Sequence, residues 1–130
     1  MTQTVDRFME FQFVAAQRLS GVPRDHAAAR LHGHTFQVRV VLSGEPEPGT
    51  GWIIDPAEMR ARAGAVIAEV DHRHLNDLPG LENPSTENLA RHLQKRLSTV
   101  LLGRVSVDIW ENPTVGCAVR GPFRKPREPT

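Results

Sequence analysis

The chain has 130 residues, 39% of them hydrophobic, which suits one domain with a single modest core. Its 16 Lys and Arg residues nearly balance its 15 Asp and Glu residues, so neither nucleic acid nor an anionic membrane is an expected partner. One cysteine excludes an internal disulfide framework, and no apolar run is long enough to span a bilayer. The first residues also lack the pattern of a secretory signal, so we expect a cytoplasmic protein.

Two N-terminal segments, 8–14 and 35–40, alternate polar and apolar residues as half-buried strands do. The stretch 43–51 is rich in glycine and proline, and we expect it to form a hairpin connection between two strands.

Two later segments have the start signals and apolar periodicity of amphipathic helices. Asp55 can cap the first helix, with Pro56 at the first helical position, and Ser85 can cap the second. The expected apolar face of the first helix comprises Met59, Ala63, Val66, Ile67 and Val70. That of the second comprises Leu89, Leu93, Leu97, Val100 and Leu101.

Two further strands, 105–110 and 117–120, are predicted after the second helix. The resulting order ββααββ predicts an α+β domain over residues 1–120, with an antiparallel four-stranded sheet and both helices on one face. In the final segment, 121–130, prolines alternate with basic residues, and we expect a flexible tail.

Six histidines in a chain of this length point to a metal site. His32 and His34 flank Gly33 at the start of a predicted strand, where residues two apart point to the same face. Two imidazoles supply half of a structural zinc site, or two of the three protein ligands of a catalytic one. The alternative is a polar strand end whose two histidines are satisfied by hydrogen bonds.

Asp71 and His72 follow the first predicted helix. An aspartate beside a histidine can hold the imidazole in one tautomer and raise its basicity, as general acid–base catalysis requires. Sequence neighbours need not face each other, so the alternative is a basic helix terminus that interacts with the helix dipole.

Glu111 ends a predicted strand and is followed by a turn. A carboxylate there can accept two parallel hydrogen bonds from the amide and amine edge of a pterin or guanine ring. The alternative is an edge-strand charge that discourages aggregation.

Together, five stretches resemble the 6-pyruvoyltetrahydropterin synthase family, above all its bacterial branch, the 6-carboxytetrahydropterin synthases of the queuosine pathway. The stretches are FVAAQRL at 13–19, RLHGHTF at 30–36, TGWIIDPAE at 50–58, VDHRHLND at 70–77 and PGLENPSTENLA at 79–90, followed by Glu111 and the Gly116–Cys117 pair. The resemblance runs from about residue 8 to residue 121.

The resemblance implies the tunnelling fold, in which subunits pair their sheet edges into a ring, usually a homohexamer, with active sites at subunit boundaries. The family uses zinc and no nucleotide cofactor. In its reaction, zinc holds the side-chain hydroxyls of dihydroneopterin triphosphate, and a cysteine moves neighbouring carbon-bound protons while triphosphate leaves.

The resemblance also assigns roles to residues of this chain. They are zinc binding by His32 and His34, proton relay by Asp71 and His72, ring anchoring by Glu111, and ring contacts by Ser85 and Thr86.

Two positions depart from the family pattern. Gln17 stands where the third zinc histidine belongs, and Ala28 stands where the catalytic cysteine belongs, while Cys117 matches a non-catalytic position. A neutral amide is a poor zinc ligand, and removing a proton-transfer group typically costs about a hundred- to ten-thousand-fold in rate. We therefore expect zinc to be weakly held or absent and the usual reaction to be slow or absent, unless His26 or His74 replaces the missing ligand.

The hypothesis is a divergent lyase or cyclase that binds a pterin-like or other planar heterocycle through Glu111 and performs altered acid–base chemistry with His72 and Asp71. One alternative is an orthodox 6-carboxytetrahydropterin synthase with a rescued metal site. Another is a non-catalytic protein that binds a pterin or purine, or acts as a scaffold.

Overall fold

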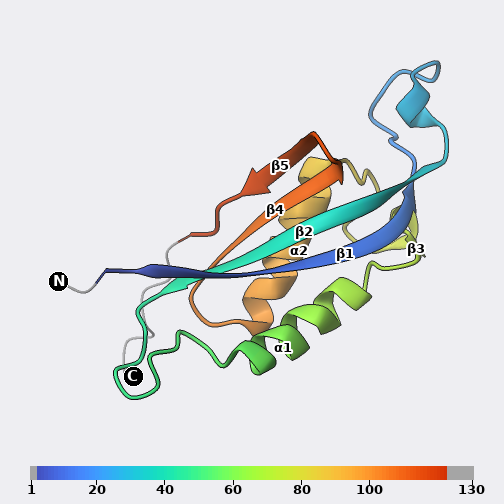
Figure 1. The fold of residues 1–130 in the computed structure, drawn as a ribbon. Coiled ribbons are helices and arrows are strands. Elements are labelled where there is room, and N and C mark those ends of the chain that lie inside the picture. The colour runs from blue at the N-terminus through green and yellow to red at the C-terminus, as the bar shows by residue number, and fades with distance from the viewer. Residues whose placement is uncertain (1–2, 123–130) are drawn as a thin grey trace, which may run out of the picture.

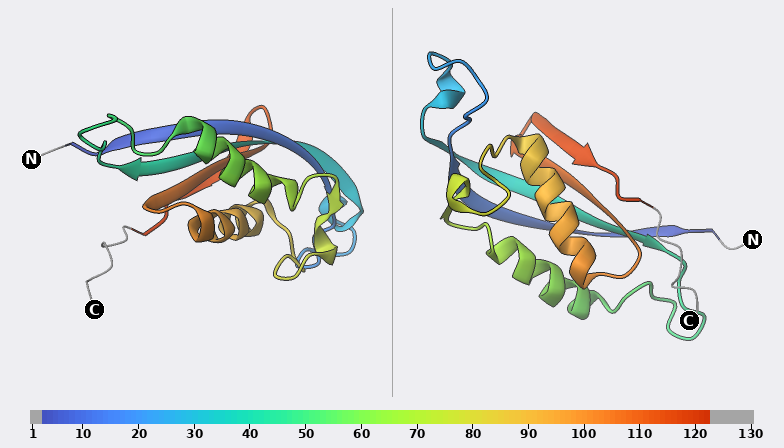
Figure 2. Two further views of the ribbon diagram at one scale, coloured as in Figure 1. Left: turned by 90° about the horizontal axis from the view of Figure 1, so that it is seen from below. Right: turned by 180° about the vertical axis from the view of Figure 1, so that it is seen from behind.

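Two helices lie on the same face of a five-stranded sheet in the computed structural model, which describes residues 3–122 (Figures 1 and 2). The strands are β1 (Val5–Gln17), β2 (His32–Gly44), β3 (Arg73–His74), β4 (Arg104–Asn112) and β5 (Val115–Val119). The helices are α1 (Pro56–Ala68) and α2 (Thr86–Val100), with short 3₁₀ helices η1 (Ala27–Ala29) and η2 (Leu75–Asp77). The strand order is β3-β1-β2-β4-β5.

The predicted α+β class is confirmed, but the prediction of a four-stranded, wholly antiparallel sheet was wrong. Arg73 and His74 form β3, which pairs in parallel with Ala15 and Ala16 of β1. A strand of two residues is too short to show any polar–apolar alternation, so periodicity gave no sign of it. The segment 43–51 is also not a hairpin, because it leads from β2 towards α1.

The core lies between the sheet and the helices. β1 and β2 pair over their whole lengths, and the alternation along them turns every second side chain towards the helices. Phe13 and Phe36 are register partners on that face and stack with their ring centroids 4.9 Å apart. The predicted helix faces are buried here, although Val100 is only partly so.

Both helices begin at the predicted caps. The Asp55 side chain accepts a hydrogen bond from the Ala57 amide at 2.8 Å, so α1 starts at Pro56. Between the helices, Arg96 of α2 makes a bidentate ion pair with Glu69, with N···O distances of 3.0 and 2.9 Å. The hydrogen bond from Arg96 lowers the pKa of Glu69.

No helix within residues 3–122 is long and apolar enough to cross a membrane. Of the predicted tail, only Gly121 and Pro122 fall inside the described residues.

Candidate functional site

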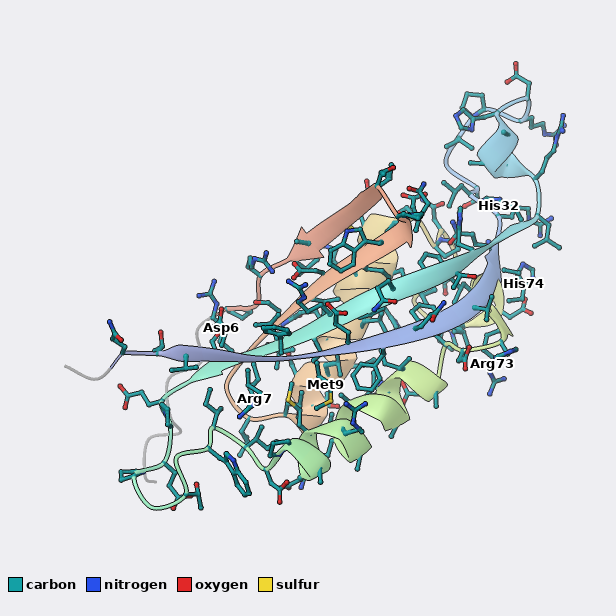
Figure 3. The ribbon with its side chains drawn as sticks, viewed as in Figure 1. Asp6, Arg7, Met9, His32, Arg73 and His74 are labelled. Atoms are coloured by element: carbon teal, nitrogen blue, oxygen red, sulfur yellow. The ribbon has the colours of Figure 1, made fainter. Side chains whose placement is uncertain are left out.

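One end of the sheet carries polar side chains on its helix-covered face. Gln17 closes β1 and is the register partner of His32, which opens β2, and His34 follows two residues later on the same face. Figure 3 shows His32 at this end of the molecule. Gln17 is buried, with 2% of its surface exposed, although the residues around it in the core are apolar.

The backbone carbonyl of Arg30 holds the His32 ring in place. Its Nδ1 lies 2.7 Å from the Arg30 carbonyl oxygen, which can only accept, so Nδ1 carries the hydrogen. In the neutral imidazole, Nε2 then has a free lone pair, and the Gln17 Nε2 group faces it at 3.5 Å. The two predicted histidines are neighbours, because the His32 and His34 rings meet edge to face with centroids 5.0 Å apart.

Glu111 joins this group from β4. Its Oε2 lies 3.9 Å from His34 Nε2, and its Oε1 accepts a hydrogen bond of 3.2 Å from the Thr86 hydroxyl. Thr86 is the first residue of α2, so the positive end of the helix dipole also favours the carboxylate. Glu111 is therefore a half-buried hydrogen-bond acceptor, and Thr86 already holds one of its two carboxylate oxygens in place.

Ser85 has a different part in the structure. Its hydroxyl accepts a hydrogen bond from the Asn88 amide at 3.1 Å and thereby caps α2. Its predicted contact with a ring stays a prediction.

The side chains of Asp71 and His72 lie in contact. His72 Nδ1 lies 2.9 Å from Asp71 Oδ1, which also accepts the Val14 amide at 3.1 Å. The His72 amide donates to the Val14 carbonyl, and His72 adopts a positive φ of 59°, which is uncommon outside glycine. The structure thus fixes the pair on the side of β1, with 78% of the His72 side chain exposed.

The structure places these residues in two groups. Gln17, His32, His34, Thr86 and Glu111 are connected through their own contacts. Within residues 3–122, no hydrogen bond or ion pair links this group to Asp71 and His72, which lie beside β1.

The residues present do not fit a tightly held zinc ion. Zinc sites use three or four His, Cys or carboxylate ligands, and the described part of the chain has no cluster of three such residues placed to hold a metal. His26 is no substitute, because its Nδ1 accepts the Ala28 amide at 3.0 Å. His74 pairs with Ala16, whose side chain points to the opposite face from Gln17.

Cys117 does not replace the thiol that Ala28 lacks. Cys117 lies in β5 and packs against the core, and this burial raises the pKa of its thiol. The negative charges of Glu87 and Glu111 raise it further. Cys117 is therefore a neutral thiol at physiological pH and a weak nucleophile.

Two asparagines outside the predicted set of site residues hold the loop between β1 and β2. Asn76 accepts the Arg18 amide at 2.9 Å and donates to the Arg18 carbonyl at 2.6 Å. Asn83 accepts the Ser20 amide at 3.2 Å. Arg18 directly follows Gln17 in the chain, so Asn76 helps to hold the backbone beside Gln17. Single asparagines have no spacing pattern by which the sequence could have revealed them.

A hollow of about 480 Å³ lies on the other, helix-free face of the sheet. Its lining includes Gln12, Arg39 and Trp110 and none of the predicted site residues. The predicted group therefore lies away from this hollow.

The family match and the sequence relatives of this chain agree with one another. The profile of the family described as 6-pyruvoyl tetrahydropterin synthase matches residues 8–122. The dihydroneopterin monophosphate aldolase of Pyrococcus furiosus is 36% identical over 89 residues, covering 66% of this chain and 75% of that protein. The 6-carboxy-5,6,7,8-tetrahydropterin synthase of Synechocystis is 30% identical over 125 residues, covering 92% of this chain and 95% of that protein.

A solved structure agrees with these matches. The 6-pyruvoyl tetrahydropterin synthase of Caenorhabditis elegans superposes with a TM-score of 0.83 at 24% identity, covering 93% of this chain and 98% of that one, which shows the shared fold. From the profile and the sequence relatives together, this chain belongs to the 6-pyruvoyl tetrahydropterin synthase family.

Proposed function

We propose that this chain is a pterin-metabolising lyase that cleaves the side chain of a dihydroneopterin by an aldol-type step. Its sequence relatives include a dihydroneopterin monophosphate aldolase and a 6-carboxytetrahydropterin synthase, which both act on pterins. The observation that carries the choice of reaction is the donor set at the sheet end, which lacks both the thiol and the third strong metal ligand.

The proposed ring site is Glu111 with Thr86. Thr86 orients one carboxylate oxygen, and the carboxylate can accept from the amino group and ring N–H of a pterin. Ser85 lies at the same helix start and completes the proposed ring contacts.

An aldol cleavage needs less from the protein than the synthase reaction. A base takes the proton of the hydroxyl on the second side-chain carbon, and the bond between the first and second carbons breaks. The electron pair enters the C6=N5 imine of the dihydropterin ring, and a proton then returns to the first carbon. The ring is the electron sink, so the step consumes no oxidant or reductant and requires no thiol.

His72 is the proposed base. The Asp71 carboxylate beside Nδ1 favours the tautomer with its hydrogen on Nδ1, which leaves Nε2 with the lone pair that takes a proton. Because His72 is highly exposed and makes no hydrogen bond or ion pair with Glu111 within residues 3–122, we propose that a second copy brings the two together. β5 closes one side of the sheet and is the proposed edge for this association, as in a ring such as a homohexamer.

The second candidate is an orthodox 6-carboxytetrahydropterin synthase. The match to the Synechocystis protein over 92% of this chain favours it. It requires a zinc ion that the residues present do not fit well.

Product analysis tests the proposal. The purified chain, in EDTA, is given 7,8-dihydroneopterin and its mono- and triphosphate, and the products are identified by mass spectrometry. We expect 6-hydroxymethyl-7,8-dihydropterin with glycolaldehyde or its phosphate, and a loss of turnover of about a hundred- to ten-thousand-fold in His72→Ala with ligand binding retained. Zinc-dependent 6-carboxytetrahydropterin would instead establish the synthase, and binding without turnover would establish a non-catalytic protein.

A further inference from the structure

Gln17 carries a buried polar atom that no other group within residues 3–122 satisfies. Its Oε1 is one of two buried side-chain polar atoms within residues 3–122 that have no hydrogen-bond partner in the protein. An unsatisfied buried acceptor is costly, and folded proteins rarely retain one without a reason. The amide is placed at the end of β1 with its residue 2% exposed, so Gln17 is not simply a surface side chain.

The orientation of the amide follows from its neighbour. The Arg30 carbonyl fixes the hydrogen of His32 on Nδ1, so Nε2 of the neutral ring presents a lone pair. The NH₂ group of Gln17 must face that lone pair, at 3.5 Å. A flipped amide would set its oxygen against the lone pair, so the unsatisfied atom is the oxygen and not the nitrogen.

This oxygen belongs to the group that reaches from β1 to β4. His34 lies beside His32, and Glu111 lies beside His34. Along this series of contacts, His34 and His32 thus lie between Glu111 and Gln17. A zinc ion here would have to take the Nε2 lone pair of His32 that the Gln17 NH₂ group already faces.

We propose that Gln17 binds a hydroxyl of the substrate's polyhydroxyalkyl side chain directly, in place of a metal ion. This inference rests on the proposed function, because it takes the ring to lie at Glu111. A hydroxyl is small and neutral, and it can donate the hydrogen bond that the amide oxygen of Gln17 lacks. Gln17 is thereby a specificity-determining residue, which distinguishes pterins that carry a hydroxylated side chain from those that do not.

Calorimetry with two stable probes tests the inference. Neopterin carries the trihydroxypropyl side chain, and 6-methylpterin has the same ring without hydroxyls. In EDTA, we expect the wild type to prefer neopterin, and Gln17→Leu to weaken neopterin binding by about 2- to 12-fold while 6-methylpterin binding is unchanged. Gln12→Leu is the matched control, because Gln12 lies on the same strand but lines the opposite face.

A second variant keeps the test decisive if Gln17→Leu folds poorly. Gln17→His restores the third imidazole, and we expect it to retain more zinc than the wild type by elemental analysis and to bind neopterin in a chelator-sensitive way.

The outcomes separate the two proposals. Wild-type binding of neopterin that is lost in EDTA and restored by zinc would overturn the role of Gln17, as would an equal loss of both probes in Gln17→Leu. If 6-methylpterin binds but neopterin binds no better, the inference fails and the ring site stands. If 6-methylpterin does not bind the wild type, the proposed function itself fails.

Discussion

At the scale of single residues, Glu111 is the side chain on which the proposed ring recognition depends. Glu111→Gln keeps the shape and the Thr86 contact but replaces one charged acceptor oxygen with a donor. We expect neopterin binding to weaken by about 1.5–3 kcal/mol, the range for hydrogen bonds to charged groups, as measured by calorimetry. Glu47→Gln, in the loop before α1, is the control and should bind normally. Equal affinities for Glu111→Gln and the wild type would remove Glu111 from the site.

Cys117 gives a prediction about pH. Because burial raises its pKa, the reactive thiolate forms only at higher pH than in a free cysteine, whose pKa is about 8.5. Alkylation by iodoacetamide should be slower than for a free thiol at pH 8 and should still be rising where the free thiol has levelled off. We also expect Cys117→Ala to retain turnover. Fast alkylation at pH 7 would contradict this environment.

Spacing predicted part of the site at this scale. The separation of His32 and His34 by two residues predicts a shared face, and their ring contact agrees with it. The unsatisfied oxygen of Gln17 could not be predicted, because it depends on a cross-strand register and on the tautomer that the Arg30 carbonyl imposes.

At the scale of elements, the β4–β5 hairpin positions Glu111. The strands change register between Trp110 and Asn112, and Gly116 packs so closely that a Cβ there would overlap the Ile109 carbonyl oxygen. The hairpin therefore needs a residue without a side chain at position 116.

Gly116→Ala should separate β5 from β4 beside Glu111. We expect a loss of about 1–3 kcal/mol in the free energy of unfolding, typical of overpacking, together with weaker neopterin binding. Urea denaturation and calorimetry measure the two effects. Gly64→Ala, in α1, is the control, because its nearest neighbour, Phe11, would be at ordinary contact distance. Unchanged stability in Gly116→Ala would refute this packing.

The helices were predictable because their signals are local. Asp55 and Ser85 cap helices from within the same few residues, and the apolar periodicity continues for several turns. β3 could not be predicted from local signals, because its two residues are defined only by pairing with a strand more than fifty residues earlier.

At the scale of the whole molecule, the proposed active site needs more than one copy of the chain. Val115 lies on β5, the last strand of the sheet, and is 49% exposed. A lysine on an edge strand opposes pairing with another chain. We expect Val115→Lys to lower the mass measured by light scattering to that of a monomer and to reduce turnover, with the circular dichroism spectrum unchanged. Leu102→Lys, at a 90% exposed position outside the strands, should keep the assembly. A wild type that is already monomeric would refute the shared site.

The proposed function depends on the sheet end binding a pterin without a metal. The most direct measurement is a crystal structure grown with neopterin in EDTA, with diffraction also recorded at the zinc absorption edge. We expect a fused ring with its amino edge on Glu111, a side-chain hydroxyl against Gln17, and no anomalous peak between His32 and His34. A zinc peak held by the two imidazoles, or a site filled by the protein's own side chains with no ring, would contradict this expectation.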